Sequence, residues 1–146
     1  MKKILFVCHG NICRSAMAEF VMKDLGAKAG RSAEFQIASA AVSREEIGNP
    51  VYPPARRELL KHGVDCDGHA ARQVTMKDYH HIDRIYYMDA SNARWLARLL
   101  PKDPDKIRPL LDRDVADPWY TGDFSKTWGD ILEGCQNILK ELGYAE

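Results

Sequence analysis

The segment Cys8–Ser15, with the sequence CHGNICRS, brings a thiol and a guanidinium close together along the chain. It follows Ile4–Val7, a short apolar run with a branched residue at each end, which is typical of a strand buried on both faces. Over residues 17–25, apolar side chains recur with the period of a helix. A strand-to-helix turn aims its backbone N–H groups and the positive end of the helix dipole at one point. The segment therefore predicts an anion site.

The residue types in this segment suit attack on a phosphate ester. Gly10 and Asn11 tolerate the left-handed conformations that a loop around an anion requires. Arg14 presents a planar fork that can hold two oxygens of a tetrahedral anion. Cys8 stands where the same field stabilises a thiolate, which would be a nucleophile beneath a bound phosphate. The Ser15 hydroxyl can donate a hydrogen bond to that sulfur.

The segment has two other interpretations. Cys8 alone is equally consistent with a small core hydrophobe beside an ordinary turn. The combination with Gly10, Asn11, Arg14 and Ser15 favours catalysis instead. A Walker-type nucleotide loop is excluded, because no Gly-Lys-Ser/Thr follows the glycine.

Cleavage of a phosphate ester also requires a proton for the leaving oxygen. The best candidate donor is Asp117, which precedes Pro118, Trp119 and Tyr120. Proline fixes the backbone after the acid, and the two rings can shield the carboxyl from water. An Asp-Pro pair more often marks only a turn, so these residues alone leave the role of Asp117 open.

Composition limits the class of protein. A chain of 146 residues, 45% of them hydrophobic, predicts one domain with a substantial core. The 21 basic and 21 acidic residues balance and form no basic block, which argues against nucleic acid as a partner. No apolar run is long enough for a membrane span, and no signal peptide is evident. The four cysteines then indicate reduced thiols in a cytosol, and their spacing does not suggest a metal site.

Strand and helix patterns alternate along the chain. Predicted strands lie at Ile4–Val7, Glu34–Ser39, Arg84–Met88 and Ile107–Leu111, the last confined to a sheet edge by Pro109. Helices are predicted between them, with a capping box at Thr75 and a cap at Asp89, and a long apolar stripe predicts a final helix ended by Gly143. This pattern predicts an α/β fold: a three-layer sandwich with a central four-stranded parallel sheet flanked by helices. The phosphate-binding loop would follow strand 1, in a single domain over residues 1–146.

The loop CHGNICRS resembles the signature loop of the low-molecular-weight protein-tyrosine phosphatases, and the likeness covers nearly the whole chain. The resemblance implies a cytoplasmic enzyme that hydrolyses phosphotyrosine in proteins, and small aryl phosphates, through a cysteinyl-phosphate intermediate without a cofactor. It implies that Asp117 is the general acid, because the family carries an Asp-Pro-aromatic motif just before its final helix. It also implies that Ser39 and His62 belong to a hydrogen-bond network that steadies Asn11. A monomer or weak dimer is expected.

We therefore expect Cys8, Arg14 and Asp117 to carry catalysis. The residues expected to bind the substrate are His9, Gly10, Asn11, Ile12, Cys13, Arg14, Ser15, Glu45, Trp119 and Tyr120. Glu45 departs from the family pattern, since tyrosine-specific members often place an aromatic ring at this rim position. This difference leaves the preferred substrate open, but it does not affect the predicted reaction.

Three rival functions remain as alternatives. Arsenate reductases use a similar loop, but they relay oxidation through further cysteines near the end of the third strand. In this chain that segment, Tyr86–Asp89, contains no cysteine, which argues against this function. The related protein-arginine phosphatases have threonine at the loop position of Ile12. A phosphate-binding module without catalysis would need no proton donor, so Asp117 argues against it.

Overall fold

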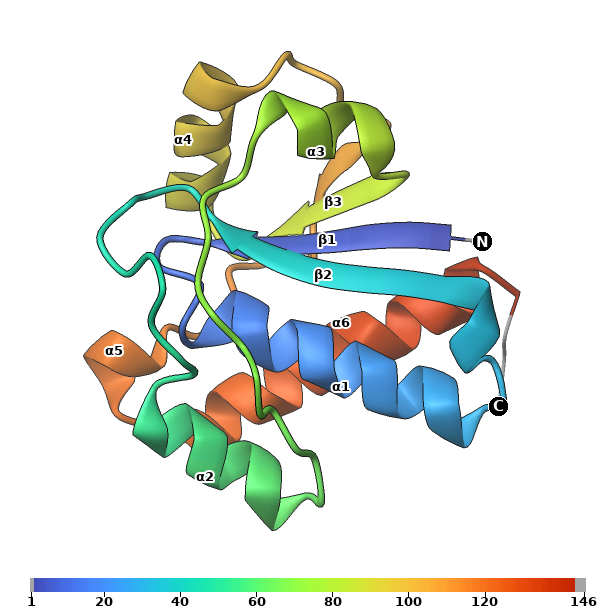
Figure 1. Cartoon of the computed structure of the whole chain (residues 1–146), viewed down its shortest axis with the longest axis vertical. Coiled ribbons are helices and arrows are strands. Elements are labelled where there is room, and N and C mark those ends of the chain that lie inside the picture. The colour runs from blue at the N-terminus through green and yellow to red at the C-terminus, as the bar shows by residue number, and fades with distance from the viewer. Residues whose placement is uncertain (1, 144–146) are drawn as a thin grey trace.

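Four parallel strands in the order β2-β1-β3-β4 form a sheet between two layers of helices (Figure 1). The structure, a computed structural model, describes residues 2–143. The strands are β1 (Lys2–Cys8), β2 (Phe35–Ala41), β3 (Arg84–Tyr87) and β4 (Ile107–Pro109). The helices are α1 (Arg14–Lys28), α2 (Pro53–Lys61), α3 (Met76–His81), α4 (Ala90–Leu99), α5 (Pro118–Thr121) and α6 (Phe124–Glu141), with a 3-10 turn at Ser32–Glu34. The predicted α/β sandwich is confirmed.

β1 lies inside the sheet and is covered on both faces. Its side chains at Ile4, Phe6 and Cys8 pack into the apolar cluster beneath α1 and α6. Those at Leu5 and Val7 pack into the second cluster, with residues of α3, α4 and β3. Because both faces are buried, the strand shows a continuous apolar run rather than an alternating pattern.

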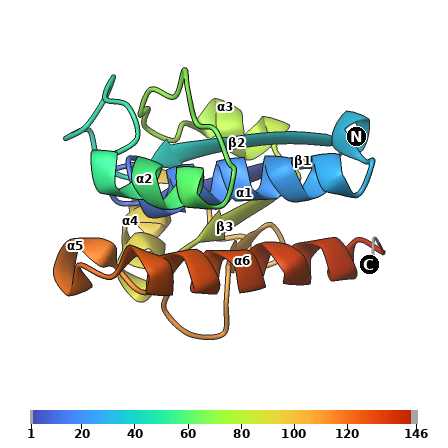
Figure 2. The ribbon, with the colours of Figure 1, turned by 90° about the horizontal axis from the view of Figure 1, so that it is seen from below.

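The two helical layers are unequal. α1, α2 and α6 cover one face of the sheet, and α3 and α4 cover the other (Figures 1 and 2).

α6 approaches the segment after β4 so closely that a Cβ atom on Gly134 would overlap the side chain of Leu110. A glycine at this position of α6 is therefore required by packing rather than by backbone conformation.

The carboxyl ends of the strands meet at one edge of the sheet, which places the loops that follow them together. In the ladder, Val7 is aligned with Ala40 on one side and Tyr87 on the other. Tyr87 is in turn aligned with Pro109 in the edge strand β4, as the proline predicted. The capping boxes at Thr75 and Asp89 are both present. None of the helices within residues 2–143 is long and apolar enough to cross a membrane.

Candidate active site

The sulfur of Cys8 lies at the centre of the loop that joins β1 to α1. It accepts hydrogen bonds from the backbone N–H groups of Asn11, at 3.3 Å, and Ser15, at 3.4 Å. The Ser15 hydroxyl lies 3.0 Å from the same sulfur. Two backbone donors and a hydroxyl thus converge on one buried atom at the start of a helix, an arrangement that stabilises negative charge on it.

Asn11 holds the loop in shape. Its φ angle of 62° is left-handed, and within residues 2–143 no other non-glycine residue has a positive φ. The side-chain amide donates to Ser15 Oγ at 2.8 Å and to Ser39 Oγ at 2.9 Å, and its oxygen accepts from the N–H of Arg72 at 3.3 Å. These bonds offset the strain of the left-handed backbone, and Ser39 lies where it was expected.

The expectation for His62 is wrong. Its ring stacks on Trp128 with centroids 3.8 Å apart, and Nε2 lies 3.0 Å from Oε2 of Glu58. His69 contacts the loop instead, donating from Nε2 to the carbonyl oxygen of Asn11 at 2.7 Å. His62 ends α2, and the helix carries its side chain to α6 rather than to the loop. Both histidines adjoin a glycine, so the local sequence gives no signal that distinguishes them.

Arg14 is held in place by residues of two later segments, one before α5 and one at the start of α4. Its guanidinium donates from Nη1 to the carbonyl oxygen of Val115 at 3.1 Å, and Nη2 pairs with Oδ2 of Asp89 at 2.9 Å. Burial lowers the pKa of Arg14, but the facing charges of Cys8, Asp117 and Asp89 outweigh burial and hold the pKa above its ordinary value. Arg14 is therefore a permanent cation, and Asp89, identified from the sequence only as a helix cap, also orients it.

Asp117 faces the same cavity from the start of α5. Its Oδ1 accepts from the N–H of Trp119 at 3.0 Å, which caps α5. Its Oδ2 lies 3.4 Å from Nη2 of Arg14, and the side chain is 28% exposed. The thiol, the guanidinium and the carboxyl that the sequence singled out are thus brought together, although Asp117 lies far from the other two in the chain.

These groups open into a cavity of about 430 Å³. It is lined by Cys8, His9, Gly10, Ile12, Cys13, Arg14, Glu45, Glu46, Asp89, Ser91, Asn92, Trp95, Asp117, Trp119 and Tyr120. Two expected substrate-binding residues, Asn11 and Ser15, are not part of this lining, because their buried side chains face away and support the loop. The polar floor and aromatic rim suit an aryl phosphate.

Aromatic side chains form opposite sides of the rim. On α5, Trp119 and Tyr120 are 63% and 85% exposed. On α4, Trp95 lies edge-on to His9 with ring centroids 6.1 Å apart, and Nε2 of His9 lies 3.3 Å from the carboxylate of Glu45. The sequence gives no signal that Trp95 lies at this rim, because its helical spacing is equally consistent with a core position.

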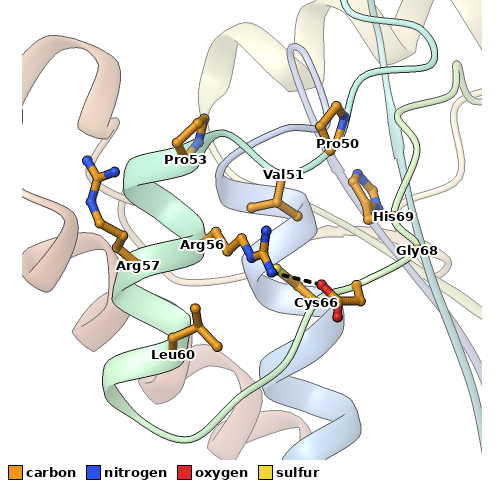
Figure 3. Close-up of a pocket in the computed structure, with 10 residues that line it drawn as sticks. Pro50, Val51, Pro53, Arg56, Arg57, Leu60, Cys66, Gly68 and His69 are labelled. Carbon is orange, nitrogen blue, oxygen red and sulfur yellow. Dashed lines mark hydrogen bonds and ion pairs between the residues drawn. The ribbon is translucent and has the colours of Figure 1, made fainter.

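A second cavity, of about 420 Å³, lies between α2 and the segment 64–69 (Figure 3). Arg56 pairs with Asp67 across it at 3.0 Å. Cys66 lies in its wall, but burial raises the pKa of this thiol, so it is protonated and a poor nucleophile. The cavity therefore lacks the arrangement found around Cys8.

The comparisons with known proteins agree with this geometry. The family model described as "Low molecular weight phosphotyrosine protein phosphatase" matches residues 3–145. The chain is similar to the low molecular weight protein-tyrosine-phosphatase YfkJ of Bacillus subtilis, with 39% identity covering 97% of this chain and 96% of the relative. The crystal structure of YfkJ superimposes with a TM-score of 0.93 and 38% identity, covering 98% of this chain and 95% of that one. The Drosophila arginine phosphatase DARP is similar at a TM-score of 0.84 and 29% identity, covering 97% of this chain and 98% of that one.

Proposed function

The chain belongs to the low molecular weight phosphotyrosine protein phosphatase family and is a protein-tyrosine phosphatase, and on that premise we propose which of its groups perform each step. The whole chain acts as one phosphatase domain. It hydrolyses phosphotyrosine through a cysteinyl-phosphate intermediate, and it also accepts small aryl phosphates.

Cys8 is the nucleophile. Its thiolate attacks phosphorus and forms the S–P bond while the P–O bond to the tyrosine breaks. The loop N–H groups from His9 to Ser15 and the guanidinium of Arg14 bind the three equatorial oxygens, whose charge must be stabilised in the transition state. The observation that supports this role is the convergence of the Asn11 and Ser15 N–H groups on the sulfur.

Asp117 is the general acid and then the general base. It gives its proton to the departing phenolate, so tyrosine leaves as the neutral phenol. The resulting carboxylate takes a proton from a water molecule that attacks phosphorus, which breaks the S–P bond and returns Cys8 as a thiolate. Its position 3.4 Å from Arg14, at the mouth of the same cavity, supports both roles.

The substrate is a phosphotyrosine side chain of a protein. Trp119 and Tyr120 contact the phenyl ring, and Glu45 with His9 lies at the rim, where flanking residues of the substrate pass. Glu45 is solvent-exposed, so its preference for nearby Lys or Arg amounts to a few-fold effect, in keeping with the ~0–1 kcal/mol of an exposed ion pair. We place the protein in the cytoplasm, as a monomer or weak dimer.

The proposal is tested with purified protein and two classes of substrate, with and without a chelator. Phosphotyrosine peptide and p-nitrophenyl phosphate should both be hydrolysed, vanadate should inhibit, and the chelator should have no effect. Hydrolysis that requires an added metal ion would contradict the mechanism.

A second candidate activity, hydrolysis of phosphoarginine, is favoured by the similarity to DARP, which is named an arginine phosphatase. The branched apolar side chain of Ile12 in the cavity lining argues for phosphotyrosine. Matched peptides carrying phosphotyrosine or phosphoarginine decide between the two, and a higher kcat/KM on phosphoarginine would overturn the assignment.

A further inference from the structure

The backbone of Ala116, the residue before Asp117, is bound on both sides by side chains of α6. Its N–H donates to Oδ2 of Asp130 at 3.0 Å. Its carbonyl oxygen accepts from Oγ1 of Thr127 at 2.9 Å. Thr127 is 0% exposed and Asp130 is 4% exposed. Both polar groups of this residue are therefore held by a rigid element at buried positions.

The residue before it, Val115, is held from the opposite direction. Its N–H donates to the carbonyl oxygen of Met88, after β3, at 2.9 Å. Its carbonyl oxygen accepts from Nη1 of Arg14 at 3.1 Å. The two residues that lead into Asp117 thus have every backbone donor and acceptor bound: those of Ala116 to α6, and those of Val115 to Met88 and to the phosphate-binding arginine.

Asp130 is itself fixed by two cations. Nη2 of Arg113 lies 3.0 Å from its Oδ1, and Nζ of Lys126 lies 3.4 Å from the same oxygen. Burial raises the pKa of Asp130, but the hydrogen bonds from the Ala116 amide and Arg113 outweigh it and bring the pKa below its ordinary value. The side chain is consequently ionised at neutral pH and can only accept hydrogen bonds.

We propose that Thr127 and Asp130 are positioning residues for the general acid, setting the direction of the Asp117 carboxyl through the backbone of Ala116. The inference rests on the proposed role of Asp117. Neither residue touches the cavity, so neither is a catalytic residue. Proton transfer depends steeply on geometry, and a displacement of about 1 Å can cost roughly 10²-fold in rate. A looser Ala116 should therefore impair proton donation more than phosphate binding.

The test uses two variants, each with a matched control. Thr127→Val removes the hydroxyl at nearly constant volume, and Thr127→Ser keeps it. Asp130→Ala removes the acceptor of the Ala116 N–H, whereas Glu133→Ala removes another carboxylate partner of Arg113, bound at 3.1 Å, that has no contact with Ala116. Values of kcat and KM are measured on aryl phosphates whose leaving groups differ in pKa, together with thermal unfolding of each variant.

Thr127→Val and Asp130→Ala should lower kcat by about tenfold for phenyl phosphate and much less for p-nitrophenyl phosphate, because a good leaving group needs less protonation. KM should change little. Thr127→Ser and Glu133→Ala should keep the wild-type dependence on the leaving group. A loss in kcat/KM, which reports the step that expels the leaving group, that is equal across the series would overturn the proposal, and so would a similar loss in Glu133→Ala. If Asp130→Ala does not fold, Thr127→Val alone carries the test.

A double variant separates failure of this proposal from failure of the assigned general acid. Adding Thr127→Val to Asp117→Asn should cause no further loss of kcat, because the hydroxyl acts through the missing carboxyl. If the two losses multiply, the positioning role is wrong while Asp117 stands. If the loss of kcat/KM caused by Asp117→Asn alone is the same for every leaving group, the assignment of the general acid is wrong. The positioning role is then wrong as well.

Discussion

Nε2 of His69 lies 2.7 Å from the carbonyl oxygen of Asn11, the non-glycine residue whose left-handed backbone shapes the phosphate-binding loop. On the other side of the imidazole, Nδ1 lies 4.0 Å from the carboxylate of Glu19. Glu19 also accepts a hydrogen bond from Ser39 at 2.5 Å, and Ser39 binds the Asn11 amide. The loop is therefore supported through its backbone by His69, and through the Asn11 side chain by Ser39 and Glu19.

Replacing His69 with Ala should lower kcat/KM by roughly threefold to tenfold, as expected when one hydrogen bond worth about 0.5–1.5 kcal/mol is lost from the loop. The matched control is His62→Ala, whose ring contacts Trp128 and Glu58 rather than the loop. The control should lower the free energy of unfolding and leave kcat/KM near the wild-type value. The reverse pattern would restore His62 as the supporting histidine.

Cys8→Ser should abolish turnover and still bind phosphate, because the loop N–H groups and Arg14 remain. Turnover is followed with p-nitrophenyl phosphate, and binding is followed by calorimetry with inorganic phosphate. Cys66→Ser is the control, since this thiol lies in the second cavity and should be dispensable for activity. Substantial turnover by the Cys8 variant would disprove the covalent mechanism.

Asp117→Asn should lower kcat for aryl phosphates by roughly 10²–10⁴-fold, the usual range for loss of a general acid. The loss should shrink as the pKa of the leaving group falls. Because Asn also caps helices well, the start of α5 should be preserved and the variant should unfold at nearly the wild-type temperature. A loss in kcat/KM, which reports the step that expels the leaving group, that is equal for every leaving group would give Asp117 a structural role only.

Peroxide should inactivate the enzyme reversibly through Cys8 and Cys13. Burial, with the nearby charge of Cys8, raises the pKa of Cys13 to about 12, so this thiol stays protonated and resists oxidation itself. Peroxide oxidises the Cys8 thiolate to a sulfenic acid, which removes the Cys8 charge that helps to raise the pKa of Cys13. The Cys13 thiol then gives up its proton and attacks the sulfenic sulfur, which forms the disulfide and releases water. Mass mapping should find the Cys8–Cys13 linkage, with activity restored by dithiothreitol. In Cys13→Ser the inactivation should become irreversible, and an unchanged recovery in that variant would rule out the linkage.

Gly134→Ala should destabilise the fold although alanine favours helices. The added methyl group would overlap Leu110, and overpacking of this kind costs about 1–3 kcal/mol. Gly129→Ala in the same helix is the control, because its Cβ would meet open space and should add about 0.5–1 kcal/mol to the free energy of unfolding. Denaturant unfolding of both variants measures the difference. A stabilised Gly134→Ala variant would contradict the close approach of α6.

Local signals in the sequence were sufficient for the elements that depend on neighbouring residues. The structure confirms the strand predicted from the apolar run Ile4–Val7, the capping box at Thr75 and the edge position of the strand that contains Pro109. The loop residues Cys8 and Arg14 lie together as their spacing indicated, since a strand-to-helix turn is a local structure. Their catalytic roles, and that of Asp117, stay predictions that the variants above will test.

The sequence by itself determined the fold class, through strand and helix patterns that alternate along the chain. It also placed Cys8 and Arg14 in one strand-to-helix loop, because these residues are only a few positions apart. Only the tertiary structure decided that His69 rather than His62 supports the loop, that Asp89 orients Arg14, and that α6 holds Ala116. These contacts join residues that are distant in the chain. They follow from the register of the strands and the close approach of α6, which no local pattern encodes.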